Sequence, residues 1–209
     1  MKWKTAISHI QNGKELVRGY DLKDVILNKS FPEAIFLVLR GEFPSEREAR
    51  MLNALCTAAI DHGIGVSSAM TARTVVSTGN SMHTAIAAGI LSMGTLHGSA
   101  IEDATRFFLE HIGETDVMGL VRRLKKAQIK VPGYGHKLLD RDPRSEALFE
   151  IAKETEFYGK HCAIAESIHE ALNALASKKI PLNVDGAMGA ILLDMGFDWR
   201  LAKGLFIIG

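Results

Sequence analysis

Three histidines of this 209-residue chain stand beside glycine, at points where the helical pattern of the sequence breaks: His62, His97 and His136. Arg144 follows a turn-forming Asp-Pro pair, and Asp185 precedes a glycine in a further break. Each residue alone is weak support for a site, because a histidine or aspartate beside glycine is most often a turn residue or a helix cap. The recurrence of this glycine setting favours a single anion-binding pocket over several separate turns.

These side chains suit carbon–carbon bond chemistry next to a carbonyl group. A carboxylate such as that of Asp185 can take a proton from the carbon alpha to a thioester. A neutral histidine can donate a hydrogen bond to the resulting enolate oxygen, and a helix N-terminus helps to keep an imidazole neutral. A second histidine can polarise the acceptor carbonyl, while Arg144 can pair with a substrate carboxylate through two parallel hydrogen bonds.

Metal binding is the competing interpretation, because sets of two histidines and an aspartate bind metals. The sequence has no HxxxH or HxxE pairing that would place two ligands on one helix face, so we favour acid–base chemistry. Cys56 and Cys162 lie far apart without ligand neighbours, and we expect both to be buried thiols. The remaining histidines lack the glycine setting and are expected to be structural or exposed: His9, His83, His111, His161 and His169.

Helices must position most of these residues, because helical periodicity dominates the sequence. Asn12-Gly13 lies between alternating segments and predicts an N-terminal β-hairpin. Capping patterns at Ser30 and Ser45 predict the starts of two helices. Further helices are expected at 66–95 (in two parts, split at Gly79-Asn80), 98–111, 116–127, 144–158, 161–177, 187–195 and from 198 onward. The predicted fold class is therefore all-α with a small N-terminal β-hairpin.

Segment 66–95 consists mostly of small and weakly polar residues, with Arg73 as its one charged side chain. Helices without a polar face are normally buried on every side. In a chain of this size that pattern favours an oligomer interface, and a purely internal helix bundle is the alternative.

Composition and charge exclude several classes of protein. A formal net charge of +1 argues against a nucleic-acid-binding or membrane-surface role. The N-terminus lacks a signal-peptide block and no run of about 18 apolar residues occurs, so we expect a cytoplasmic protein without a membrane partner. The sequence stops within an apolar helical pattern, KGLFIIG, and we expect a further C-terminal segment to follow it.

Taken in order, the glycine-flanked segments resemble those of the citrate synthase superfamily. The similarity covers nearly the whole chain and rests on DHG with SSAMTARTVVST, LHGSAIEDA, VPGYGHKLLDRDPRSEAL and NVDGAMGAILLDMGF. It implies a helical fold of a large and a small domain, a cleft between them and an obligate homodimer. We expect the large domain at 1–98, with 196–209 returning to it, and the small domain at 99–195.

The resemblance also implies roles for single residues. Asp185 would exchange a proton with the methyl carbon of acetyl-CoA, and His97 would stabilise the enol or enolate. His136 would face the oxaloacetate carbonyl or the citryl hydroxyl, while His62 and Arg144 would hold the carboxylates. No cofactor would be bound permanently, because the coenzyme A thioester is a substrate. The backbone of the following loop would contact the adenine end of coenzyme A: Val131, Pro132, Gly133, Tyr134 and Gly135.

Several details resemble the short citryl-CoA lyase group and the lyase module of ATP-citrate lyase more than a typical synthase. Gly186 stands where a typical synthase has an aromatic residue, the spacing from His136 to Arg144 is one residue shorter, and the chain is short. The favoured activity is therefore cleavage of citryl-CoA to acetyl-CoA and oxaloacetate.

Two alternatives stay open. His97 within Leu-His-Gly is synthase-like, so the first is citrate or 2-methylcitrate synthase, an acyltransferase type associated with the tricarboxylic acid cycle. The second is an inactive helical dimer that serves as a binding subunit. It is considered because family members carry further carboxylate-binding arginines in the C-terminal segment, one of them just beyond the point where this chain stops.

Overall fold

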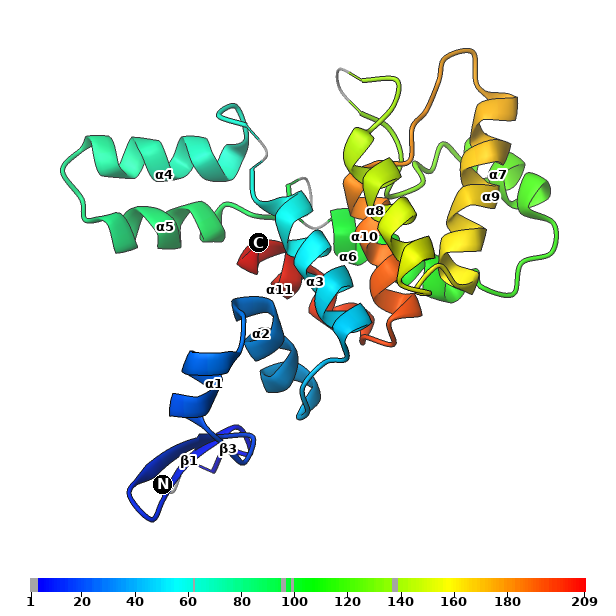
Figure 1. Cartoon of the computed structure of the whole chain (residues 1–209). Helices are drawn as coiled ribbons and strands as arrows, with labels where there is room; N and C mark the ends of the chain where they lie inside the picture. Colours follow the sequence, from blue (N-terminus) through cyan, green and yellow to red (C-terminus); the bar gives the residue numbers. More distant parts are fainter. Residues whose placement is uncertain (1–3, 62, 95–96, 99, 137–138) are drawn as a thin grey trace. The chain divides into compact units, whose positions relative to one another are not determined.

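The structure is a computed structural model of the chain, and it describes residues 4–61, 63–94, 97–98, 100–136 and 139–209 (Figure 1). The chain divides into two compact units, Met1–Ala54 and Leu55–Gly209. The predicted class is confirmed, since helices make up most of the chain and a small antiparallel sheet opens it. The large and small domains expected from the resemblance stay a prediction.

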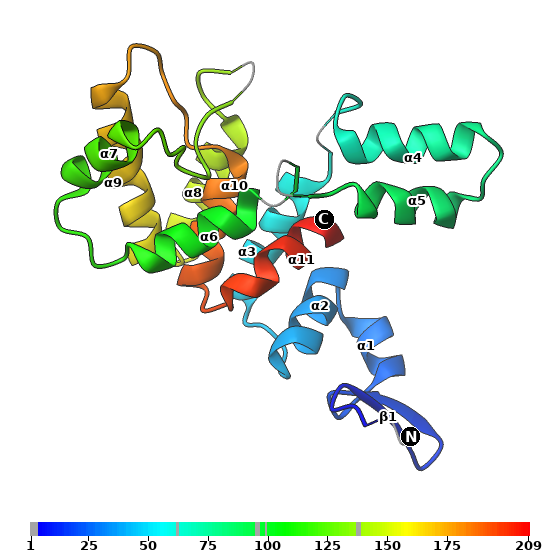
Figure 2. The same ribbon diagram turned by 180° about the vertical axis from the view of Figure 1, so that it is seen from behind.

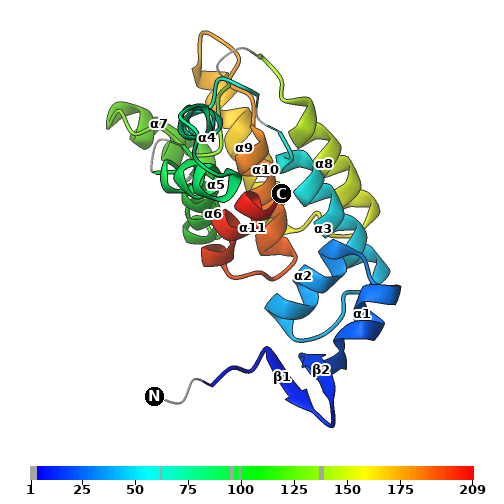
Figure 3. The ribbon, with the colours of Figure 1, turned by 90° about the vertical axis from the view of Figure 1, so that its left-hand side faces the viewer.

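The N-terminal unit opens with the antiparallel strands drawn in Figure 3, whose order is β1-β2-β3. Asn12 and Gly13 form the turn between β1 and β2 with φ of 51° and 73°, as their sequence predicts. The strands are β1 (Ser8–Gln11), β2 (Lys14–Val17) and β3 (Tyr20–Asp21).

Two short helices follow in this unit, α1 (Leu22–Asn28) and α2 (Phe31–Arg40). The start of α2 is the predicted one, since Ser30 and Glu33 form a capping box there. The sequence did not predict β3 or α1, because two and seven residues are too short to show a clear period. Helix α3 (Glu46–Ala59) then passes from the first unit into the second.

Helices α4 (Ser67–Ser77) and α5 (Met82–Leu91) form an antiparallel pair, with Gly79 in the turn at φ 87°. Only Ala85 and Gly89 of the described residues in the two helices are buried. The predicted split of segment 66–95 is confirmed. The purely internal bundle is not what this single chain forms, because most of the two helical surfaces remain exposed.

The core of the second unit surrounds α10, which contacts α6, α8 and α9 (Figure 1). Every residue from Gly186 to Leu193 is buried, as expected for a helix without a polar face. Figure 2, the view from behind, shows α6 and α11 side by side. The elements are α6 (Ala100–Glu110), α7 (Val117–Lys126), α8 (Pro143–Glu154), α9 (Lys160–Leu175), α10 (Val184–Asp194), the 3₁₀ helix η1 (Trp199–Leu201) and α11 (Ala202–Ile208).

Helix α10 begins at Val184, three residues before the predicted start. The side chain of Asn183 caps the helix by accepting a hydrogen bond of 3.1 Å from the Gly186 N–H. The segment from Asn183 to Gly186, taken from the sequence as a break, is therefore a helix start, and Asp185 lies in the first turn. Among the described residues, no helix has both the length and the apolar character needed to cross a membrane.

Candidate active site

Asp185 lies at the end of α10 where the helix dipole is positive, and it keeps partial solvent exposure. Within the described part of the chain its carboxylate receives no hydrogen bond and forms no ion pair. Burial raises the pKa of the Asp185 carboxyl to about 6, and the charge of Asp142 adds to the rise, while Arg144 and His97 oppose it. A carboxyl group in this state exchanges protons readily near neutral pH.

His97 follows α5 and contacts the first turn of α4. Its Nε2 accepts a hydrogen bond of 3.3 Å from the Ser68 N–H and lies 2.9 Å from the Ser68 hydroxyl. An Nε2 that accepts from a backbone N–H carries no proton, so the ring is neutral and its proton is on Nδ1. His97 therefore offers one N–H donor, Nδ1–H, for an oxyanion.

The loop from Val131 to His136 is tied to the start of α10 by backbone hydrogen bonds. The Asn183 N–H donates to the Gly133 carbonyl at 3.0 Å, and the Gly135 N–H donates to the Pro181 carbonyl at 2.8 Å. The Asn183 side chain also donates to the Gly135 carbonyl at 3.0 Å. These bonds fix the loop against the helix end that carries the catalytic carboxylate candidate.

Two glycines allow this close approach. A Cβ at Gly186 would lie 2.5 Å from the Gly133 carbonyl oxygen, and a Cβ at Gly133 would lie 2.8 Å from the Gly186 Cα. Gly133 also has φ of 84°, a conformation that favours glycine. The Gly186 noted in the sequence therefore has a packing reason in this chain: no side chain fits there while the loop keeps its place.

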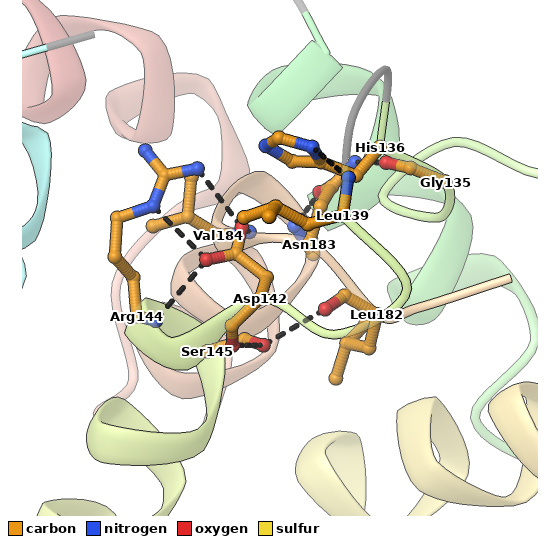
Figure 4. A network of polar contacts seen from close by, with 10 residues as sticks. Gly135, His136, Leu139, Asp142, Arg144, Ser145, Leu182, Asn183 and Val184 are labelled. Atoms are coloured by element: carbon orange, nitrogen blue, oxygen red, sulfur yellow. Dashed lines mark hydrogen bonds and ion pairs between the residues drawn. The ribbon is translucent and has the colours of Figure 1, made fainter.

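His136 ends this loop and accepts a hydrogen bond of 3.0 Å at Nδ1 from the Leu139 N–H (Figure 4). The neutral ring then carries its proton on Nε2, which can donate to a carbonyl oxygen of a substrate. The two histidines thus present opposite nitrogens as donors, Nδ1 of His97 and Nε2 of His136.

Arg144 lies in the first turn of α8, with 27% of its side chain exposed. Its Nε and Nη2 atoms donate to the Asp142 carboxylate at 3.0 and 2.9 Å, the two-pronged geometry of an arginine–carboxylate pair (Figure 4). The pair orients the guanidinium. The positive charge of Arg144 lowers the pKa of Asp185, against the effect of burial.

A cavity of about 420 Å³ lies beside the loop, lined by Val131 and Tyr134 together with residues of α7, α9 and the segment after α9. Three lysines line it, and none of its described lining residues carries a carboxylate: Lys125, Lys130 and Lys178. The rest of the lining is mostly apolar, including Val121, Leu172 and Ile180. An apolar cavity with several cations at its walls suits an aromatic ligand that carries phosphate groups.

The structure brings together most of the side chains selected from the sequence. Arg144 and His97 lie close enough to Asp185 to lower the pKa of its carboxyl, and hydrogen bonds join the loop before His136 to the start of α10. His62 lies outside the described residues. Tyr134 directs its hydroxyl to the Ala165 carbonyl at 2.7 Å, so its side chain supports the core while its backbone remains in the loop.

Sequence reasoning missed the residues that hold the site together. The sequence presents Asp142 only as part of a turn-forming Asp-Pro pair, and it assigns Ser68 and Asn183 no separate role. The Asp-Pro pair before Arg144 is a helix-start pattern, a cap followed by proline at the first helical position, and it is the one signal that could have pointed to Asp142.

The described residues offer little to a metal ion. No group of three or more histidine, cysteine, aspartate or glutamate side chains within them could hold one. Cys162 is buried as predicted, whereas Cys56 is partly exposed. Burial raises the pKa of both thiols, so neither is a ready nucleophile.

Comparison with known proteins links this geometry to a family. Residues 39–209 match the family model described as Citrate synthase, C-terminal domain. The solved structure of citryl-CoA lyase from Hydrogenobacter thermophilus is similar, with 47% identity and a TM-score of 0.91 over 99% of this chain and 81% of that chain. ATP citrate lyase from Methanothrix soehngenii, solved in complex with citrate and coenzyme A, has 26% identity and a TM-score of 0.90 over 100% of this chain and 37% of that chain.

Among curated proteins, ATP-citrate synthase beta chain protein 2 of Arabidopsis thaliana is 32% identical over 139 residues, which is 65% of this chain and 23% of that protein. The chain thus spans less than a quarter of the length of this relative. The fold expected from the sequence motifs is confirmed by the solved structures. Because the family model matches most of its length, this chain belongs to the citrate synthase family.

Proposed function

We propose that the chain catalyses the cleavage of citryl-CoA to acetyl-CoA and oxaloacetate. The observation that carries the proposal is the Asp185 carboxyl in the first turn of α10, whose pKa is raised to about 6 beside a neutral histidine and an arginine. The similarity to a citryl-CoA lyase supports this direction of the reaction.

The roles of the side chains follow from their donors and acceptors. In the condensing direction Asp185 takes a proton from the methyl carbon of acetyl-CoA, and Nδ1–H of His97 donates to the enolate oxygen. Nε2–H of His136 donates to the oxaloacetate carbonyl oxygen, where negative charge develops as the carbon–carbon bond forms. After condensation the new alkoxide takes a proton from water. Cleavage reverses these steps: the citryl hydroxyl gives its proton to water, the carbon–carbon bond breaks as the oxaloacetate carbonyl forms, and the enolate carbon takes its proton from Asp185, which regains a proton from solvent.

Substrate binding is assigned to the two remaining features of the site. Arg144 holds a carboxylate of the four-carbon acid, and His62 is proposed to assist it. The backbone of residues 131–135 and the cavity beside it accept the adenosine end of coenzyme A, whose phosphates fit the lysines that line the cavity. No permanently bound cofactor is needed, because coenzyme A arrives as part of the substrate.

Citrate synthase activity is the second candidate, since the same residues serve both directions of the carbon–carbon step. The two activities differ in the fate of the thioester, which a synthase hydrolyses and a lyase leaves intact. Citrate synthase activity remains a candidate because the chain belongs to the citrate synthase family. The third candidate, an inactive helical subunit, is disfavoured by the neutral-donor geometry of His97 and His136.

The assembly is proposed to be a homodimer formed through α4 and α5. Large apolar side chains of both helices are exposed in the single chain, a pattern that marks contact surfaces. They are Met70, Val76, Met82, Ile86, Ile90 and Leu91, with 39% to 86% of their surface exposed. Light scattering should give the mass of a dimer, and Ile86→Glu should convert it to a monomer.

One preparation tested in both directions decides between the candidates. Citryl-CoA is supplied first, and oxaloacetate is followed with malate dehydrogenase. Acetyl-CoA and oxaloacetate are supplied separately, and free coenzyme A thiol is followed. Oxaloacetate release with little thiol in the second assay supports the lyase, whereas rapid thiol release identifies a synthase. An inactive protein in both assays would overturn the proposal.

A further inference from the structure

Asp142 is a buried carboxylate that joins two helix ends of the site. Its side chain has no exposed surface and accepts four N–H groups. Three come from Arg144: the backbone N–H at 3.1 Å, Nε at 3.0 Å and Nη2 at 2.9 Å. The fourth is the Val184 N–H at 3.0 Å, from a residue 42 positions away in the chain.

The two carboxylate oxygens of Asp142 each contact both Arg144 and a helix start. One carboxylate oxygen, Oδ1, caps the start of α8 and holds Nε of Arg144. The other, Oδ2, holds Nη2 of Arg144 and the first N–H of α10. Figure 4 shows the carboxylate between the guanidinium and the backbone at Val184. The arginine and the helix turn that carries Asp185 are therefore fixed by the same two atoms.

We propose that Asp142 is a positioning residue for the carbon–carbon reaction, one that fixes Arg144 relative to the first turn of α10 and places a negative charge beside Asp185. This inference rests on the proposed function. It adds a residue that touches no reacting atom and acts through Arg144 and Asp185.

The charge of Asp142 gives the proposal a signature in pH dependence. The groups that act electrostatically on Asp185 are Arg144 on α8, Asp142 before it and His97 after α5. Burial opposes ionisation of Asp142, but hydrogen bonds from Arg144 and Val184 hold the pKa of its carboxyl below the ordinary value, so it stays charged at neutral pH. That charge repels an ionised Asp185 and partly neutralises the attraction of Arg144. Removing it should therefore lower the pKa of Asp185 through both effects.

A purely structural role is the simpler explanation, because an aspartate before a helix often serves only as a cap worth about 1 kcal/mol. Ser145 provides a matched control. It is buried next to Asp142, carries no charge, and donates its hydroxyl hydrogen within the same network, where its oxygen lies 2.8 Å from both the Asp142 and Leu182 carbonyls. Ser145→Ala removes packing and a hydrogen bond from this network without changing the charge near Asp185.

The test measures the pKa of Asp185 directly, by ¹³C NMR of the full chain labelled at aspartate carboxyl carbons. The Asp185 resonance is assigned by its loss in Asp185→Asn. In Asp142→Asn the pKa of Asp185 should fall by about one unit. In the condensation assay, the acid limb of the pH profile of kcat/KM for acetyl-CoA should move to lower pH by the same amount. The KM for oxaloacetate should rise about tenfold. Ser145→Ala should lower the melting temperature while leaving the Asp185 titration in place.

An unchanged Asp185 titration in folded Asp142→Asn would overturn the proposal. The NMR arm needs no turnover, so it decides the inference even if both activity assays fail and the proposed function with them. Asp142→Glu supplies a second test that keeps the charge and serves if the asparagine variant does not fold. It should leave the pKa of Asp185 raised while KM for oxaloacetate rises, because the longer side chain misplaces Arg144. An unchanged KM in Asp142→Glu would also overturn the positioning role.

Discussion

Helix α10 carries a largely buried carboxylate near each end, and the two are held in opposite ways. Asp194, in the last turn, accepts the N–H groups of Gly159, His161 and Cys162 at 2.9 to 3.0 Å and the Nδ1 atom of His161 at 2.8 Å. Burial alone would raise its pKa, but these hydrogen bonds hold the pKa of the Asp194 carboxyl below its ordinary value. Asp185, in the first turn, receives no such bond among the described residues, and its pKa is raised.

The difference separates a structural carboxylate from a reactive one. The first N–H groups of α9 have no carbonyl acceptor within their own helix, and Asp194 of α10 accepts them instead. Asp194 therefore holds α9 and α10 together. Its lone pairs are engaged and its proton affinity is low. Asp185 has no hydrogen-bond partner among the described residues and its pKa is raised, which stabilises the fold less but suits proton exchange with carbon.

Asp185→Asn should reduce turnover in both assay directions by roughly 10²- to 10⁴-fold, because the amide keeps the shape of the side chain but cannot accept the proton. Folding and coenzyme A binding should be retained, as measured by circular dichroism and calorimetry. Near-normal turnover in this variant would show that Asp185 has no role at the carbon atom.

Asp194→Asn should destabilise the fold by about 2–4 kcal/mol, because it removes the charge that four donors share and turns one acceptor into a competing donor. Urea unfolding measures the loss. Turnover per folded molecule should stay at the level of the unmodified chain, in contrast to Asp185→Asn. A loss of turnover without a loss of stability would reverse the roles assigned to the two ends of α10.

Stability should depend on pH with opposite sign at the two residues. The pKa of Asp185 is raised by folding, so the chain loses stability as pH rises from about 4 to above 6, by roughly 1–3 kcal/mol. Asp185→Asn should remove this loss and melt at a higher temperature than the unmodified chain at pH 7.5. The pKa of Asp194 is lowered, so its contribution is present above the ordinary aspartate range and is lost as pH falls through the folded pKa. Melting curves of both variants across pH 3–8 test the signs, and equal slopes would contradict the comparison.

Gly186→Ala should have the smallest effect, a rise of a few-fold in KM for the coenzyme A thioester. The added methyl group would lie 2.5 Å from the Gly133 carbonyl oxygen, so the loop must move away from α10. Gly204→Ala, in α11 with open space at its Cβ position, is the matched control. Equal KM values for the two variants would show that the loop position does not affect thioester binding.

The sequence was most informative where chemistry and local pattern coincide. Asn12-Gly13 predicted its turn, Ser30 its helix start, and the glycine setting selected His97, His136 and Asp185. Local patterns could not show that Asp142 holds Val184, or that Asp194 caps α9, because each contact joins residues more than thirty positions apart. The role of Asn183 as a helix cap was also missed, since Asn-Val-Asp-Gly has the composition of a loop as much as of a helix start.

Citryl-CoA cleavage in D₂O tests most directly whether Asp185 exchanges a proton with the substrate carbon. The acetyl-CoA formed is examined by mass spectrometry. With the unmodified chain the acetyl methyl group should carry one deuterium, and with Asp185→Asn this product should form at 1% or less of that rate. Deuterated acetyl-CoA formed by Asp185→Asn at close to the unmodified rate would contradict this role of Asp185.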